Sequence, residues 1–148
     1  MRVLLSTVSS DSHTWNLVFL QLLLEESGHD VINLGSCVPD ELLLERAREL
    51  RPDAIVISTV NGHGHLDGAR LIRLLRADPV ARGIPAMIGG KLGIRDDREH
   101  GAELFEAGFD AVFSDTDDPG ALTAYLGELA PSTSELVLSG APRPGVSE

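Results

Sequence analysis

The chain has 148 residues, a length that fits one domain and leaves little room for two. Its 23 acidic and 12 basic residues give a formal net charge of −11, which argues against a nucleic-acid-binding protein, because such proteins neutralise phosphates with Lys and Arg. The single cysteine, Cys37, excludes an intramolecular disulfide, so we expect the protein to work in a reducing cytoplasm. From the N-terminal pattern and the short apolar runs we expect neither a secretory leader nor a membrane-spanning segment.

Apolar runs rich in Val and Ile alternate with amphipathic segments. In chain order they predict five strand–helix pairs, over residues 2–8 and 15–28, 30–34 and 39–50, 53–59 and 66–78, 84–89 and 98–108, and 110–113 and 118–129. Gly28 and Gly108 stand at the ends of two of these predicted helices, where glycine is a common stop. The pattern predicts an α/β fold, a flavodoxin-like (Rossmann-like) five-stranded parallel sheet of order 2-1-3-4-5 with helices on both faces.

The last part of the chain has a different composition. Residues 131–148 are rich in Pro, Ser and Gly, which is typical of a segment that adds little to a core. We therefore expect one domain over residues 1–130 and a flexible C-terminal tail over residues 131–148.

A histidine stands directly after the first predicted strand, in the run Asp11-Ser12-His13-Thr14-Trp15-Asn16. In open α/β sheets, ligands bind at the carboxyl ends of the strands, where this loop must lie. An imidazole there can bind a transition metal, and Asp11 can accept its second ring proton. The residues leave open a second interpretation, an ordinary polar loop in which Asp11 or Ser12 caps the helix.

Two further loops are rich in glycine. Ser58-Thr59-Val60-Asn61-Gly62-His63-Gly64 follows the third predicted strand, and Ile88-Gly89-Gly90-Lys91-Leu92-Gly93 follows the fourth. Alone, each is compatible with a tight turn, and Lys91 with the backbone N–H groups would also suit an anion. Because the fold brings both loops beside His13, together they favour a deep slot next to a metal-ligating histidine.

These residues resemble the motif of the cobalamin-binding domains, most closely that of the small subunit of glutamate mutase (methylaspartate mutase). The family pattern is Asp-x-His-x-x-Gly, then Ser-x-Leu, then Gly-Gly, and the resemblance covers about residues 2–129. The corresponding runs here are Asp11 to Asn16, Ser58 to Val60, and Gly89-Gly90. Asn16 stands where the family has glycine, and Val60 stands where it has leucine.

The resemblance implies that His13 replaces the dimethylbenzimidazole base of cobalamin as the lower cobalt ligand, so that the cofactor binds base-off. Asp11 would hydrogen-bond the far nitrogen of His13, and the displaced nucleotide tail would enter the slot between the two glycine-rich loops. The implied metal ligand is His13 alone. The implied cofactor-binding residues are Ser10, Asp11, Ser12, His13, Thr14, Asn16, Ser58, Thr59, Val60, Gly62, Gly64, Gly89, Gly90, Lys91 and Leu92.

By the same resemblance the chain is the small subunit of an adenosylcobalamin-dependent carbon-skeleton mutase, an isomerase that interconverts L-glutamate and 3-methylaspartate. A large barrel-type subunit would hold the substrate, so we expect a hetero-oligomer, no catalytic residue in this chain, and no nucleic-acid or membrane partner. Two alternatives are a stand-alone cobalamin-binding carrier or regulatory module, and a receiver-type signalling domain. A receiver domain needs an acidic pair after the first strand and an aspartate at the end of the third, where this chain has Ser58-Thr59.

Overall fold

The computed structural model describes residues 1–8, 15–59, 64–90, 97–114 and 119–129. The chain divides into two compact units, Met1–Asp117 and Asp118–Glu148. Within the described residues, no helix is long and apolar enough to cross a membrane. The predicted tail over residues 131–148 lies outside the described residues and stays a prediction.

The first unit contains a five-stranded parallel sheet. Its strands are β1 (Arg2–Thr7), β2 (Asp30–Asn33), β3 (Ala54–Thr59), β4 (Ala86–Gly90) and β5 (Ala111–Ser114). Their order is β2-β1-β3-β4-β5, which confirms the predicted order. Each strand begins and ends within two residues of the predicted bounds.

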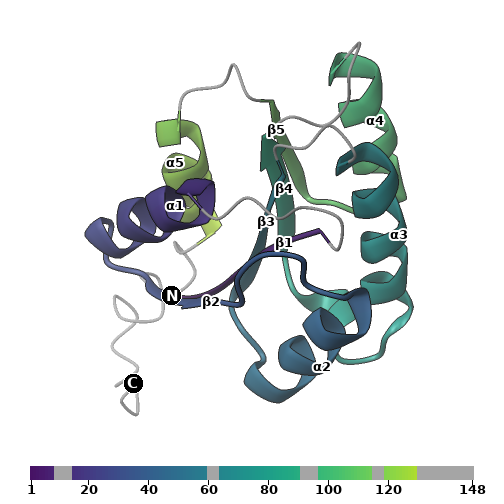
Figure 1. The fold of residues 1–148 in the computed structure, drawn as a ribbon, viewed down its shortest axis with the longest axis horizontal. Coiled ribbons are helices and arrows are strands. Elements are labelled where there is room, and N and C mark those ends of the chain that lie inside the picture. The colour runs from purple at the N-terminus through teal and green to yellow at the C-terminus, as the bar shows by residue number, and fades with distance from the viewer. Residues whose placement is uncertain (9–14, 60–63, 91–96, 115–118, 130–148) are drawn as a thin grey trace, which may run out of the picture. The chain divides into compact units, whose positions relative to one another are not determined.

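Helices lie on both faces of this sheet, as predicted. Figure 1 shows α1 (Trp15–Glu26) on one face, and α2 (Asp40–Leu50), α3 (Gly64–Ala77) and α4 (Asp97–Ala107) on the other. A short 3₁₀ helix, η1 (Ala81–Gly83), follows α3 and was not predicted. The second unit contains α5 (Pro119–Leu129).

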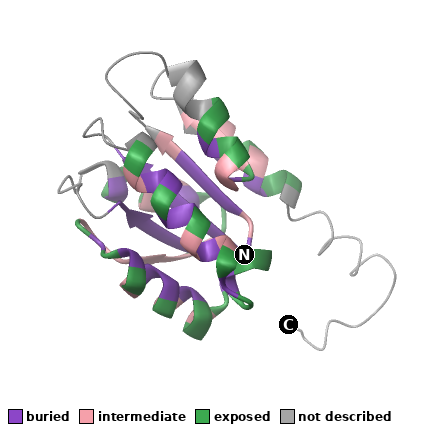
Figure 2. Ribbon diagram, turned by 90° about the vertical axis from the view of Figure 1, so that its right-hand side faces the viewer, coloured by how far each residue is buried: buried purple, intermediate pink, exposed green. Residues whose placement is uncertain are grey.

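β1, β3 and β4 are buried over most of their length, as their purple colour in Figure 2 shows, whereas the described residues of the edge strands β2 and β5 are half-buried or exposed. Side chains alternate between the faces of a strand, so each strand contributes to two apolar layers. The layer against α2, α3 and α4 contains Leu4, Ile55, Ile57 and Ile88 from the strands and Leu43, Leu71 and Leu75 from the helices. The opposite layer, on the side of α1, contains Val3, Leu5, Val56 and Met87, all buried.

A buried carboxylate fixes the turn between α3 and η1. Asp78 is 4% exposed, and its Oδ1 accepts a hydrogen bond from Arg48 Nε of α2 at 2.6 Å. Its Oδ2 accepts bonds from the backbone N–H groups of Val80 at 2.9 Å and Ala81 at 2.8 Å. The Arg48 guanidinium, followed by the N–H groups of Ala81 and Val80, lowers the pKa of Asp78 below its ordinary value.

The lowered pKa of Asp78 predicts how stability depends on pH. Because the folded pKa lies below the unfolded one, the stabilisation is present near neutral pH and is lost as the pH falls through the folded pKa. We expect Asp78→Asn to lower the free energy of unfolding at pH 7 and to flatten its decline at acidic pH. Urea unfolding between pH 7 and pH 2.5 measures both effects. Glu41→Gln, at an exposed carboxylate of α2, is the control and should leave the curve close to that of the wild type.

Candidate functional site

One row of residues crosses the carboxyl edge of the sheet. The strand register pairs Thr7 of β1 with Ser58 of β3, Ser58 with Gly89 of β4, and Gly89 with Phe113 of β5. These four residues follow Leu5, Val56, Met87 and Ala111 by two positions each, so they lie on the same face of the sheet as those residues. The row therefore lies on the side of α1.

The row is short of side-chain bulk over its central strands. Thr7 and Ser58 are each 2% exposed, and Gly89 has no side chain. One position earlier, on the opposite face of the sheet, β3 and β4 carry Ile57 and Ile88 in register. The α1 side is thus cleared of large side chains at Ser58 and Gly89, whereas the opposite face carries Ile57 and Ile88 one position earlier and Thr59 and Gly90 one position later.

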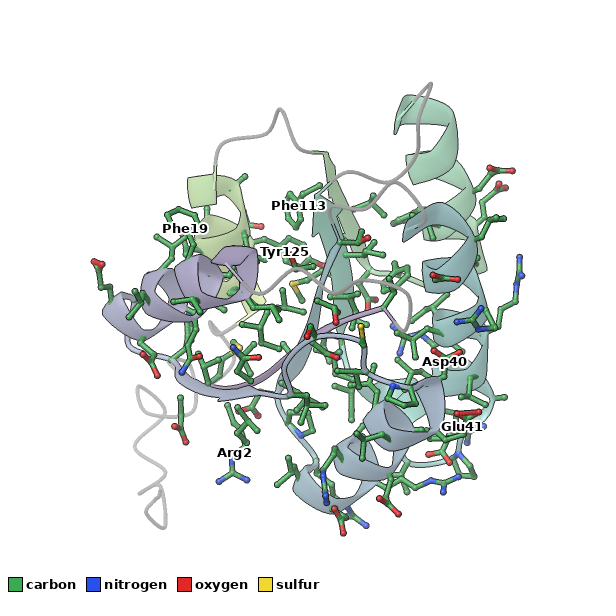
Figure 3. The ribbon with its side chains drawn as sticks, in the orientation of Figure 1. Arg2, Phe19, Asp40, Glu41, Phe113 and Tyr125 are labelled. Atoms are coloured by element: carbon green, nitrogen blue, oxygen red, sulfur yellow. The ribbon has the colours of Figure 1, made fainter. Side chains whose placement is uncertain are left out.

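Phe113 closes the row on the β5 side, where Figure 3 labels it. A Cβ atom at Gly89 would lie 3.3 Å from Phe113 Cβ and 3.4 Å from the Phe113 carbonyl oxygen, which is tight packing. No local sequence pattern marks Phe113 as a site residue. Counting every second residue of the fifth strand, in register with Gly89, would have placed it in the row.

Hydrogen bonds hold the ends of β1 and β2 together. Thr7 Oγ1 donates to the Gly35 carbonyl oxygen at 3.2 Å, and the Gly35 N–H donates to Asn33 Oδ1 at 2.8 Å. Gly35 has a φ of +93°, a conformation that glycine adopts without strain. Asn33 Nδ2 in turn donates to Gln21 Oε1 of α1 at 3.1 Å. This chain of bonds connects α1 and the loop after β2 to the strand that leads into the predicted histidine loop.

The structure brings together the strand ends from which the three predicted loops leave. Ser58, Thr59, Gly89 and Gly90 lie at the ends of β3 and β4, while Asn16 and Gly64 lie in the first turns of α1 and α3. The other predicted site residues lie outside the described residues: Ser10, Asp11, Ser12, His13, Thr14, Val60, Gly62, Lys91 and Leu92. Their proposed roles therefore stay predictions.

Among the described side chains, no group of three or more His, Cys, Asp or Glu residues could hold a metal ion. His29 lies just before β2, at the opposite edge of the sheet, with Nδ1 3.3 Å from the N-terminal amino group. Burial and the positive N-terminus lower the pKa of His29. His29 is therefore remote from the row of Thr7, Ser58 and Gly89.

A groove of about 470 Å³ lies between α1 and the end of β2. It lies beside the edge strand rather than over β3 and β4, and it adjoins the row only through Gly35, whose carbonyl oxygen accepts the hydrogen bond from Thr7. Its walls come from six residues: Leu17, Val18, Gln21, Asn33, Leu34 and Gly35.

Solved structures similar to this chain show its fold. A cobalamin-binding protein from Desulfitobacterium hafniense DCB-2 superposes with a TM-score of 0.71 at 19% identity, over 86% of this chain and 58% of that one. The receiver domain of a sensor histidine kinase from Pseudomonas aeruginosa PAO1 superposes with a TM-score of 0.65 at 20% identity, over 86% and 95% of the two chains. The fold alone does not separate these two classes, but β3 ends in Ser58-Thr59, without the aspartate that a receiver domain requires.

The amino-acid sequence separates the cobalamin-binding class from the receiver class. The family model described as the B12 binding domain matches residues 1–121. The glutamate mutase sigma subunit of Fusobacterium nucleatum is 32% identical over 114 residues, which cover 76% of this chain and 83% of that subunit. This chain therefore belongs to the B12 binding domain family, among the glutamate mutase sigma subunits.

Proposed function

We propose that this chain is the small, cobalamin-binding subunit of an adenosylcobalamin-dependent isomerase that interconverts L-glutamate and 3-methylaspartate. The cleared row at Thr7, Ser58 and Gly89 carries the proposal, because it is where a B12-binding chain must make room for a large cofactor. The sigma-subunit relatives support the choice of mutase, and the name of these relatives implies a catalytic partner subunit.

The residues at the carboxyl edge fit a cobalamin whose nucleotide tail is extended. A flat heterocycle needs a buried surface with small side chains, which Thr7, Ser58 and Gly89 supply, and an aromatic or apolar wall, which Phe113 supplies. Thr59, Gly90 and the predicted residues Val60, Gly62, Gly64, Lys91 and Leu92 would extend this slot along the two loops.

His13 would bind the lower face of cobalt, and Asp11 would hold its second ring nitrogen and so fix the tautomer and raise the basicity of the ligand. Ser10, Ser12, Thr14 and Asn16, in the same loop and the first turn of α1, would contact the cofactor with hydroxyl and amide groups. When bound, adenosylcobalamin supplies the radical chemistry of the rearrangement through its cleavable cobalt–carbon bond. The contribution of this chain is to bind and orient the cofactor, so we assign it no catalytic residue.

Co-expression with a mutase-type large subunit tests the proposal. We expect the purified pair to isomerise glutamate with adenosylcobalamin, and neither subunit to do so alone. The isolated chain should also bind cobalamin. Cobalamin binding without any assembly or isomerisation would favour the stand-alone carrier or regulatory module, and a chain that binds no cobalamin would overturn both assignments.

A further inference from the structure

The outward side of α1 carries apolar side chains, whereas α2, α3 and α4 carry several charged residues. From Trp15 to Leu24 the helix has no charged residue, and Val18, Phe19 and Leu22 are 44%, 51% and 57% exposed. Figure 3 labels Phe19 on this helix. By contrast, α2 presents charged groups such as Glu41, Glu45 and Glu49 to solvent. A helix that is apolar in its exposed positions is typical of one that another surface covers.

The groove between α1 and β2 adjoins these side chains through Val18, which lines it. Its polar walls are already paired, because Asn33 bonds to Gln21 at 3.1 Å and to the Gly35 N–H at 2.8 Å. Leu17, Val18 and Leu34 complete the lining. An apolar side chain could enter this groove without leaving a polar group unsatisfied, whereas an ionic ligand would find no charged partner in its walls.

The charges around α1 indicate the kind of partner. Glu25 and Glu26 end the helix and Asp30 begins β2, all three exposed. Since the chain carries a net charge of −11, two copies of it repel each other over a distance. A different protein with apolar side chains flanked by Lys or Arg would complement both the stripe and its acidic end.

The position of α1 indicates which partner protein would cover these side chains. The helix starts at Trp15, directly after the predicted histidine loop, so Val18 and Phe19 lie in its first turns, next to the cofactor edge. A catalytic subunit that covers the reactive face of the cofactor must approach the same edge and can extend along α1. We therefore propose that Val18, Phe19, Leu22 and the adjoining groove, here termed the α1 surface, dock the catalytic partner subunit, an inference that rests on the proposed function.

A pair of exposed phenylalanines tests the α1 surface. Phe105 of α4 is 59% exposed, close to the 51% of Phe19, but lies on the opposite face of the sheet. We expect Phe19→Asp to weaken binding to the mutase large subunit by about tenfold or more, as loss of an aromatic anchor does. Phe105→Asp should leave that binding unchanged.

The acidic end of α1 gives a second test. The double variant Glu25→Lys, Glu26→Lys should associate with the large subunit more slowly than the wild type, and the wild-type association rate should fall as salt is added. Titration calorimetry and surface plasmon resonance measure these quantities.

Cobalamin binding by each isolated variant keeps the two proposals distinguishable. The inference holds if Phe19→Asp binds cobalamin and unfolds thermally as the wild type does, yet loses the large subunit. The inference is overturned if Phe19→Asp still assembles normally with the large subunit. It is also overturned if the variant unfolds at a clearly lower temperature, which would mean that another part of the same chain covers Phe19. A third contrary result is a dimer of the wild-type chain in sedimentation that the variant no longer forms. A wild-type chain that binds no cobalamin overturns the proposed function itself.

Discussion

Replacing His13 with alanine should remove the histidine signal from bound cobalamin while the chain stays folded. In the proposed site His13 is the single protein ligand of cobalt, so its loss leaves the metal with water or with the cofactor's own base. We expect the affinity for cobalamin to fall by about 100-fold, and Asp11→Asn to lower it by about tenfold, because outer hydrogen-bond partners of a ligand typically matter at that level.

Electron paramagnetic resonance of the cobalt(II) form measures the ligation directly. With ¹⁵N-labelled histidine in the wild-type chain, the hyperfine splitting should change from that of ¹⁴N, and in His13→Ala it should be insensitive to the label. His29→Ala is the control, since His29 lies beside the N-terminal amino group at the other edge of the sheet. A spectrum that still depends on labelled histidine in His13→Ala would rule out this ligand.

Sequence patterns predicted the strands well because the central strands are apolar on both faces and have turn signals close to their ends. β3, for example, is the run Ala-Ile-Val-Ile-Ser-Thr, buried along its whole length. The α/β alternation together with the rule for right-handed crossovers then sufficed to order the strands and to bring Ser58 and Gly89 to one edge. Those two residues are neighbours in the register, which is what the proposed slot requires.

Features that depend on long-range contacts were not predictable in this way. The bond between Gln21 of α1 and Asn33 of β2 depends on how the helix packs, and neither residue carries a local signal for it. Likewise Arg51 and Cys37 adopt positive φ angles of 45° and 50° without being glycine, so no sequence rule marks these turns. The exposure of Phe19 is of the same kind: an apolar helix in the sequence looks like a buried one, and tertiary structure decides which faces are covered.

The second large effect concerns the space at Gly89. Gly89→Leu should weaken cobalamin binding by about 100-fold, because an overpacked site costs up to about 3 kcal/mol and each 1.4 kcal/mol is a factor of ten. The added Cβ would already lie 3.3 Å from Phe113 Cβ, so the rest of the leucine must project into the row beside Ser58. Equilibrium titration with hydroxocobalamin measures the affinity, and circular dichroism checks that the variant is folded.

Gly83→Leu is a matched control for this experiment. Gly83 lies in η1, where an added Cβ meets no atom within 4 Å, so the same substitution introduces bulk without filling the row. We expect it to bind cobalamin as the wild type does. If Gly89→Leu also binds normally while it is folded, the cofactor does not use the cleared row on the α1 side. The nucleotide tail would then have to lie on the opposite face beyond Ile57 and Ile88, where Thr59 pairs with Gly90, or outside the sheet edge altogether.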